Sequence, residues 1–115
     1  MPSTQMISRQ VSIGQWIVGD GYPCRIVAEL GQNHNGNLET AIEMIRIAKN
    51  IGIDAVKLQK RDCDLCVPEP QKLKRRDTQW GEMTYLEYRK KLEFGRAEFD
   101  AIDRECRQLG LPWFA

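Results

Sequence analysis

Two side chains of opposite charge stand in two short apolar runs of this 115-residue chain. Glu29 ends the run Ile26-Val27-Ala28-Glu29, and Lys57 lies within Ala55-Val56-Lys57-Leu58-Gln59. A carboxylate can transfer a proton, whereas an ammonium group offsets the charge of an anionic substrate. Because side chains alternate along a strand, Lys57 and Gln59 share the face opposite to the apolar side chains beside them. Neighbouring strands would bring these polar groups together, either as a structural ion pair or as an anion-binding or acid–base site.

A polar loop, Gly31-Gln32-Asn33-His34-Asn35-Gly36, follows the first run. Its backbone amides, with the N-terminus of the helix that follows, could hold an anionic or carbonyl group, and His34 is available for a hydrogen bond. The alternative is a plain turn, in which the asparagine and glycine residues only accommodate unusual backbone angles. The pattern alone leaves both interpretations open.

A helix must separate the two runs, because apolar residues recur at steps of three and four between Leu38 and Ile51. Asn37 is the expected N-cap of this helix, and Gly52 is expected to form its left-handed C-terminal cap. The second strand is predicted to follow at once, over about residues 54–59.

The second half of the chain predicts two more helices and one more strand. Thr84-Tyr85-Leu86-Glu87 has the spacing of a capping box, and a further helix is expected over Phe99–Leu109, ending at Gly110. The run Leu111–Ala115 then repeats the helix–glycine–strand order of residues 48–56. Strands joined by crossover helices are parallel, and parallel strands need cover on both faces. Three strands with two crossovers do not easily provide it, so the chain is expected to be part of a larger fold.

Two segments give a less regular pattern. Residues 15–18 and 24–28 flank Gly19-Asp20-Gly21-Tyr22-Pro23, which predicts a hairpin or at least a turn between strands. Residues 60–83 are charged, contain two prolines and show no clear periodicity, which is typical of a binding loop, a lid or a disordered insert. A basic cluster in this segment is either a solvated surface or a phosphate-closing lid; it consists of Lys72, Lys74, Arg75 and Arg76.

Composition narrows the class of protein. A hydrophobic fraction of 42% argues against wholesale disorder, and a formal charge of +1 gives no field that would favour nucleic acid or an anionic membrane as partner. No apolar stretch approaches the roughly 18 residues that span a bilayer, and residues 1–10 lack the apolar segment of a signal peptide. We therefore expect a cytoplasmic protein with reduced cysteines. Cys63 and Cys66 have the spacing of a zinc or redox motif, but no second pair accompanies them.

The two runs and the loop together resemble the N-terminal barrel segment of the sialic acid synthase (N-acetylneuraminate synthase) family. The similar segments are Ile26–Gly36 and Asp54–Lys60, correctly spaced around one helix. Four further segments also resemble the family, so that the resemblance covers nearly all of the chain from about Trp16 onward; they are Trp80-Gly81, Thr84-Tyr85, Leu92-Glu93-Phe94 and the strand from Gly110 to Ala115.

The resemblance implies an α/β fold, the N-terminal portion of a (β/α)8 TIM barrel that is truncated after the third barrel strand, since a full barrel needs about 250 residues. It implies an N-terminal hairpin or leader over residues 1–23 and a partial synthase domain over residues 24–115, without the family's C-terminal antifreeze-like domain. The implied enzyme is a transferase of carbohydrate biosynthesis that condenses phosphoenolpyruvate with N-acetylmannosamine, or a related N-acyl sugar, and releases phosphate. This chain alone is expected to be inactive.

The same resemblance implies roles for five residues. Glu29 matches a family glutamate placed for proton transfer or for holding reacting hydroxyl groups. Lys57 matches the lysine that contacts phosphoenolpyruvate, and Gln59 matches a residue that faces the sugar. Asn33 and His34 match the family's loop motif and are assigned a supporting part in substrate binding.

The family also uses a divalent metal, typically manganese, to polarise the aldehyde of the open-chain sugar. The resemblance places its histidine ligands on later barrel strands, so no metal ligand is predicted within residues 1–115. Family members are homodimers, and we expect the full-length form to be one, with no nucleic acid or membrane as partner. Lys60 stands where many relatives carry a small hydroxyl residue, which leaves the exact sugar open.

Three alternatives remain open at this point. A legionaminic or pseudaminic acid synthase of the same family would use another N-acyl sugar. A condensing enzyme of the keto-deoxy sugar type would share the barrel, although the motif from Glu29 to Gly36 argues against it. A stand-alone binding module without catalysis is the third.

Overall fold

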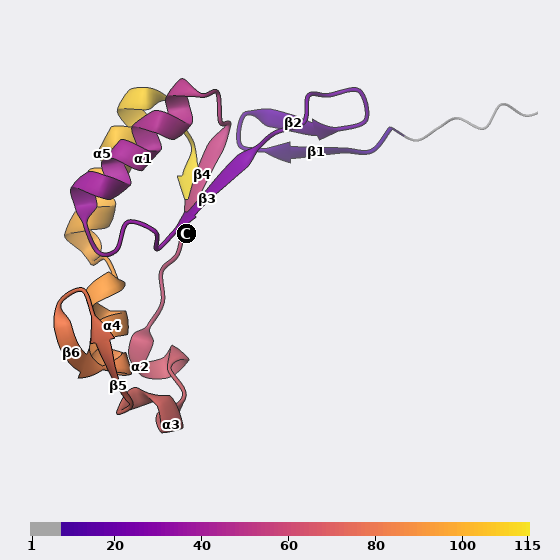
Figure 1. The fold of residues 1–115 in the computed structure, drawn as a ribbon. Helices are drawn as coiled ribbons and strands as arrows, with labels where there is room; N and C mark the ends of the chain where they lie inside the picture. Colours follow the sequence, from indigo (N-terminus) through magenta and orange to yellow (C-terminus); the bar gives the residue numbers. More distant parts are fainter. Residues whose placement is uncertain (1–7) are drawn as a thin grey trace, which may run out of the picture.

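The computed structural model describes residues 8–115, and its centre is a parallel sheet of three strands in the order β3-β4-β7. The strands are β3 (Val27–Gly31), β4 (Ala55–Leu58) and β7 (Trp113–Phe114), and the helices α1 (Leu38–Asn50) and α5 (Arg96–Leu109) lie side by side on one face of the sheet (Figure 1). The predicted alternation of parallel strands and crossover helices is thereby confirmed. Residues 1–7 of the predicted leader lie outside the described residues.

Helix α1 begins and ends where its sequence predicts. The side chain of Asn37 accepts a hydrogen bond from the backbone N–H of Thr40 at 3.0 Å, which satisfies one of the free amides of the first turn. Ile51 caps the C-terminal end, and Gly52 follows with a φ of +87°. Helix α5 likewise ends at Gly110, which adopts the left-handed conformation.

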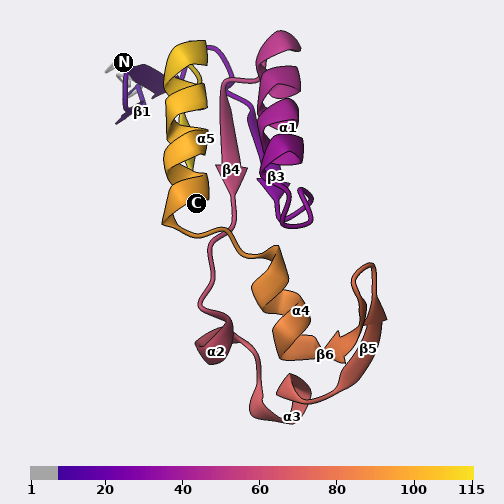
Figure 2. The same ribbon diagram turned by 90° about the vertical axis from the view of Figure 1, so that its left-hand side faces the viewer.

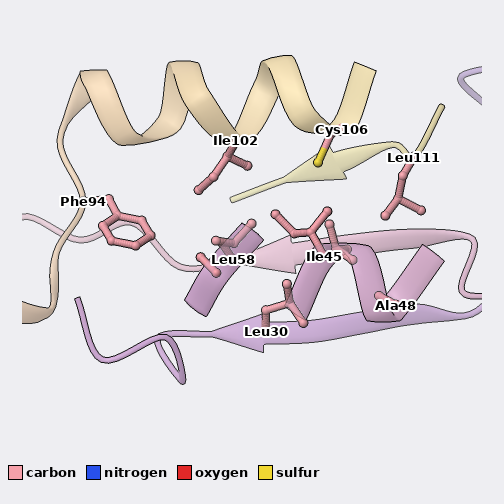
Figure 3. Packing of buried hydrophobic residues seen from close by; sticks show 10 residues of the cluster. Leu30, Ile45, Ala48, Leu58, Phe94, Ile102, Cys106 and Leu111 are labelled. Carbon is pink, nitrogen blue, oxygen red and sulfur yellow. The ribbon is translucent and has the colours of Figure 1, made fainter. Parts of the chain in front are cut away.

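The hydrophobic core lies between these two helices and the sheet (Figure 3). Val56 and Leu58 of β4 are fully buried beneath the helices, which confirms that the apolar face of this strand packs against them. Burial also raises the pKa of the Cys106 thiol on α5 to about 11, so this cysteine is a packing residue rather than a nucleophile. The buried cluster consists of Leu30, Ala41, Ile45, Ala48, Val56, Leu58, Phe94, Ile102, Cys106 and Leu111.

The N-terminal hairpin differs from the prediction. Strand β2 (Trp16–Gly19) pairs antiparallel with β1 (Gln10–Ile13), and not with residues 24–28. The predicted hairpin was wrong because the alternating run before Gly14 supplies a nearer partner across a two-residue turn. The Asp20-Gly21 segment instead forms a turn that leads from the hairpin toward β3, which agrees with the weaker prediction of a turn between strands.

Residues 60–83 are not a structureless loop, contrary to the prediction. They form two short helices, α2 (Cys63–Cys66) and α3 (Glu69–Lys72), and an antiparallel pair, β5 (Arg75–Thr78) with β6 (Gly81–Thr84). The sequence does not indicate them because α2 and α3 are about one turn long and β5 and β6 contain almost no apolar residues, so neither a helical period nor an apolar–polar alternation is present.

Helix α4 (Tyr85–Leu92) follows β6 and starts at the predicted capping box of Thr84 and Glu87, which the structure confirms. We refer to residues 60–93 as the excursion. The excursion leaves the sheet beyond the carboxyl end of β4 and returns to it at the start of α5 (Figure 2). Among residues 8–115 no helix combines the length and the apolar character that a membrane crossing requires.

Candidate active site at the carboxyl ends of the strands

Glu29 and Lys57 face each other on the side of the sheet that the helices leave uncovered. The parallel register of β3 and β4 places the two residues opposite each other, and the Lys57 Nζ lies 2.5 Å from the Glu29 Oε2. The side chain of Glu29 is 46% exposed and that of Lys57 is 38% exposed. Ion pairs with this much exposure stabilise a fold by about 1 kcal/mol or less, so stability is a weak reason for the pairing. The pair is an accessible acid and an accessible cation at one sheet edge.

A break in the strand pairing shapes the region next to this pair. The register of β3 against β4 shifts between Glu29 and Gly31, and Gly31 adopts a φ of +56°. A Cβ atom at Gly31 would lie 3.4 Å from the Glu29 Oε1 and 3.9 Å from the Gln59 side chain. The side chains of Glu29 and Gln59 therefore both lie next to the turn at Gly31. The backbone N–H of Gln59 donates a hydrogen bond to the Gly31 carbonyl at 3.3 Å.

An open groove of about 400 Å³ lies over this turn. Three of the predicted residues line it: Glu29, Asn33 and Gln59. Lys57 reaches it through its contact with Glu29, and Asn33 is anchored by a hydrogen bond from its Nδ2 to the Leu30 carbonyl at 3.0 Å. The structure thus brings four of the five predicted site residues together.

His34, the fifth, lies beneath the loop rather than in the groove. It is 2% exposed, its ring stacks on Phe94 with the centroids 3.9 Å apart, and its Nδ1 accepts a hydrogen bond from the Gly36 N–H at 3.0 Å. Burial lowers the pKa of His34, against a smaller opposing influence from the Glu93 carboxylate. A neutral imidazole in this place supports the loop from below.

The excursion contributes groove residues that the sequence interpretation missed. Arg61 follows Gln59 at the strand-like spacing of two, so the alternation of β4 extended by one step could have identified it. Tyr88 and Arg89 come from α4, and Gln32 comes from the polar loop. No local pattern indicates the α4 residues, because they lie about thirty residues after Gln59 in the sequence and reach the groove only through the tertiary fold.

One largely buried carboxylate, Glu93, connects these segments. The side chain of Glu93 is 9% exposed and accepts hydrogen bonds from the backbone N–H of Arg61 at 3.1 Å and from the Lys60 Nζ at 3.3 Å. It also accepts a hydrogen bond from the Gln32 amide, whose Oε1 in turn accepts one from the Arg89 Nη2 at 2.6 Å. Glu93 therefore joins the polar loop, the exit of β4 and the end of α4.

The predicted basic cluster is engaged elsewhere on the excursion. Lys72 forms an ion pair with Glu69, and Arg75 pairs with Glu82 at 2.6 Å. The Arg76 guanidinium lies 4.4 Å from the centre of the Tyr88 ring. None of the four basic residues lines the groove.

The described residues offer no ready metal site. Within residues 8–115, no three His, Cys, Asp or Glu side chains gather into a set that could hold an ion. Cys63 and Cys66 are free thiols within α2, and burial raises the pKa of Cys63. The residues present therefore do not fit a resident metal.

Comparison with known proteins shows similarity along most of the chain. A sequence profile described as the NeuB family matches residues 44–115. Human N-acetylneuraminate-9-phosphate synthase is 39% identical over 103 residues, which are 85% of this chain and 27% of the human protein. The N,N'-diacetyllegionaminic acid synthase of Legionella pneumophila is 47% identical over 49 residues, 43% of this chain and 14% of that protein.

A solved structure supports the same similarity. The crystal structure of an N-acetylneuraminic acid synthetase from Leptospira borgpetersenii superposes with a TM-score of 0.76 at 26% identity, and the match covers 94% of this chain and 34% of that protein. The chain thus spans about a third or less of the length of the relatives it matches.

Proposed function

The chain belongs to the NeuB family, and from this premise we propose that it forms the N-terminal part of a sialic-acid-type synthase. The proposed enzyme condenses phosphoenolpyruvate with N-acetylmannosamine, or a related N-acyl sugar, to form a nonulosonic acid and release phosphate. The observation that carries the proposal is the exposed Glu29–Lys57 pair, which stands at the carboxyl ends of parallel strands on an uncovered sheet face. Catalytic residues emerge at this end of the strands in α/β barrels.

Each of the five predicted site residues has a proposed role in this reaction. The Lys57 ammonium offsets the negative charge of phosphoenolpyruvate, and its contact with Glu29 fixes where that charge is bound. Glu29, as a partly exposed carboxylate, accepts or returns the proton of a reacting hydroxyl group or water. Gln59 and Asn33 offer amide groups to the hydroxyl and N-acyl groups of the sugar. His34 holds the loop that carries Asn33.

The reaction also calls for a divalent metal, which we expect to be manganese and which would polarise the sugar aldehyde. Within residues 8–115 no three His, Cys, Asp or Glu side chains gather into a set that could hold this ion, and we expect its histidine ligands on later strands. The steps assigned to Glu29, Lys57, Gln59 and Asn33 therefore concern binding and proton transfer alone.

The open sheet face supports a barrel as the complete fold. Helices α1 and α5 cover one face of the sheet, whereas the other face and the N-terminal hairpin border an apolar groove of about 500 Å³. Further strands would bury this groove, as parallel sheets require cover on both faces. We expect the complete barrel to be a cytoplasmic homodimer and the chain alone to be inactive. The groove is lined by apolar side chains that include Trp16, Val18, Val27, Ala55, Trp113 and Phe114.

A related nonulosonic acid is the second candidate product. The match to the legionaminic acid synthase favours it, because 49 residues of this chain are 47% identical to that enzyme. Assays of the intact protein with N-acetylmannosamine and with the diacetylated legionaminic precursor sugar would separate the two candidates.

The test of the proposed function uses the intact protein that contains this chain. With phosphoenolpyruvate, N-acyl sugar and Mn²⁺, we expect a nonulosonic acid and one phosphate per turnover. Glu29→Gln should abolish the product with an unchanged melting temperature, whereas the matched variant Glu43→Gln, on the exposed side of α1, should retain full turnover. Near-normal turnover of Glu29→Gln would remove Glu29 from the mechanism, and no product with any N-acyl sugar would overturn the proposed function.

A further inference from the structure

Two cysteines that the proposed function does not use lie one helical turn apart on the excursion. Cys63 begins the four-residue helix α2 and Cys66 ends it, and both are free thiols. Residues three apart in an α-helix have Cα atoms about 5 Å apart, which is within the range of about 4.4–6.8 Å that a disulfide spans. The spacing of the two cysteines therefore permits a bond between their sulfur atoms.

The two thiols differ in their access to solvent. Cys66 is exposed, whereas Cys63 is only 6% exposed, and burial raises the pKa of the Cys63 thiol. Because a thiolate and not a thiol attacks a disulfide, the exposed Cys66 is the first nucleophile and Cys63 is the thiol that resolves the intermediate. An accessible thiol beside a resolving thiol is the usual arrangement of a redox-active cysteine pair.

An open cleft of about 450 Å³ lies beside Cys63, between α2 and the end of α4. Its walls carry charges of both signs, among them those of Arg61, Asp64 and Lys90. A small peptide disulfide such as oxidised glutathione has both ammonium and carboxylate groups, which form charge-assisted hydrogen bonds with walls of this kind. The cleft therefore suits a small charged disulfide better than an apolar reagent.

Helix geometry makes a disulfide at this spacing reversible. Cβ atoms three residues apart on a helix are about 5–6 Å apart, whereas a disulfide brings them to about 3.5–4.5 Å. The adjustment of about 1 Å falls on Cys66, because Cys66 is exposed and Cys63 is buried. A strained and exposed disulfide has a higher reduction potential than a structural one, so cellular thiols reduce it again.

We propose that Cys63 and Cys66 form a reversible dithiol–disulfide site that reacts with a low-molecular-weight peptide disulfide such as oxidised glutathione. Neither cysteine lines the groove, so the site is independent of the proposed function.

The reaction proceeds by two thiol–disulfide exchanges. The Cys66 thiol loses its proton to water, and its thiolate attacks one sulfur of oxidised glutathione; the S–S bond breaks, and the first glutathione leaves as a thiolate that takes up a proton. Cys63 then loses its proton and attacks the Cys66 sulfur of the mixed disulfide, and the second glutathione leaves in the same way. The two protein thiols are thereby oxidised to one disulfide, and oxidised glutathione is reduced to two thiols.

The experiment exposes the intact protein to excess oxidised glutathione, alkylates the free thiols and maps the tryptic peptides by mass spectrometry. Trypsin cleaves after Arg61 and Lys72, so both cysteines lie in one peptide, residues 62–72. We expect this peptide to become about 2 Da lighter through the loss of two hydrogen atoms, with neither cysteine alkylated. Addition of dithiothreitol should return it to the reduced form.

Two serine variants separate the roles of the thiols. Cys63→Ser should retain a glutathione adduct on Cys66, because no thiol resolves it. Cys66→Ser should leave Cys63 reduced, because the buried thiol does not attack the reagent. Cys24→Ser, which removes another exposed cysteine, is the matched control and should leave the disulfide unchanged.

Three outcomes would overturn the proposal. A peptide that stays fully reduced in excess oxidised glutathione would remove the site. A lasting glutathione adduct on Cys66 of the unaltered protein would show that Cys63 does not resolve it, and an adduct on Cys63 in the Cys66→Ser variant would contradict the assigned order. Cys66 is exposed, so its substitution leaves the fold intact and keeps the test valid if Cys63→Ser fails to fold.

Discussion

Backbone register, rather than burial, holds Glu29 and Lys57 together. The two residues are partners in a parallel ladder, so the strands bring the carboxylate and the ammonium together even though both side chains are partly exposed. A substitution at either position therefore changes the chemistry of the groove with little effect on packing. Because chemistry and packing can be changed independently at these two positions, the pair is suited to kinetic tests.

We predict that Lys57→Met in the intact protein raises the KM for phosphoenolpyruvate at least tenfold, because a cation that offsets anionic charge is lost. The free energy of unfolding should change by about 1 kcal/mol or less, since the ion pair is exposed. Steady-state kinetics and urea denaturation measure the two effects. Lys49→Met, in the last turn of α1, is the matched control and should leave the KM unchanged.

Because His34 is buried, its protonation should lower the stability of the fold, and the direction of this pH dependence follows from its pKa. Burial lowers the pKa of His34 below its ordinary value of 6.5, so the unfolded chain binds the proton more readily than the folded one. The stability that neutral His34 contributes is fully present above about pH 6.5 and is lost as the pH falls through the folded-state pKa.

We therefore expect the intact protein to lose more stability between pH 7.5 and pH 5.5 than its His34→Asn variant does, when both are unfolded in urea. The comparison isolates this residue because every other titratable group is the same in both proteins. An identical pH dependence of the two proteins would show that burial of His34 has no effect on folding.

At the scale of elements, the polar loop and the end of α4 make a close backbone contact beside the site. Gly36 has a φ of +76°, and a Cβ atom there would lie 2.3 Å from the Lys91 carbonyl oxygen. Gly52, at the other end of α1, has a similar φ of +87° but open space around it.

We predict that Gly36→Ala destabilises the protein by about 2–4 kcal/mol, whereas Gly52→Ala costs about 1 kcal/mol for its backbone conformation alone. The difference between the two free energies of unfolding measures the backbone contact between the loop and α4. Equal values would mean that the loop and α4 separate without loss of stability.

Glu93 should control how firmly the excursion is attached. Replacing it by alanine removes the acceptor for the Gln32 amide and the Arg61 N–H. We expect hydrogen exchange in residues 60–93 to accelerate while the amides of α1 and α5 stay protected. Glu98→Ala, which removes a capping contact to the Gly95 N–H, is the control and should affect only the start of α5. Unchanged exchange in the excursion of Glu93→Ala would contradict the role of this carboxylate.

The sequence predicted the elements that repeat and missed those that do not. The helical period between Leu38 and Ile51, its caps and the glycine turns are local signals, and they led to the parallel sheet. Alternation along β3 and β4 likewise placed Glu29 with Lys57 and Gln59. The excursion was missed because its strands contain almost no apolar residues and its first two helices are about one turn long. The partner of β2 was missed because tertiary structure, and not the local pattern, decides which strands pair. Arg89 and Glu93 were also missed, because tertiary contacts bring them to the groove and no local sequence pattern indicates such contacts.

At the scale of the whole molecule, the described chain is not compact. Its radius of gyration is 19.5 Å, whereas a compact domain of 115 residues has about 13 Å. The hairpin and the excursion project from the sheet in different directions (Figure 1). The apolar groove beside the hairpin adds an uncovered surface that includes Trp113 and Phe114.

We predict that the 115-residue chain alone forms no product from phosphoenolpyruvate, N-acetylmannosamine and Mn²⁺, because its groove supplies part of the proposed site and no set of metal ligands lies among residues 8–115. A colorimetric assay for the nonulosonic acid measures the product, with the intact protein as positive control. Product formed by the purified chain would contradict both the prediction and the assignment of the metal ligands to later strands.

The hydrogen bond between the Arg61 N–H and the Glu93 carboxylate joins the two ends of the excursion. A segment whose ends meet can be exchanged as a unit, because closing the gap with a short turn or another insert leaves the strands and helices beneath it in place. The two arginines at the groove travel with such a unit, whereas Glu29, Lys57 and Gln59 stay behind on the sheet. The part of the groove that the excursion supplies can therefore change independently of the part that the sheet supplies.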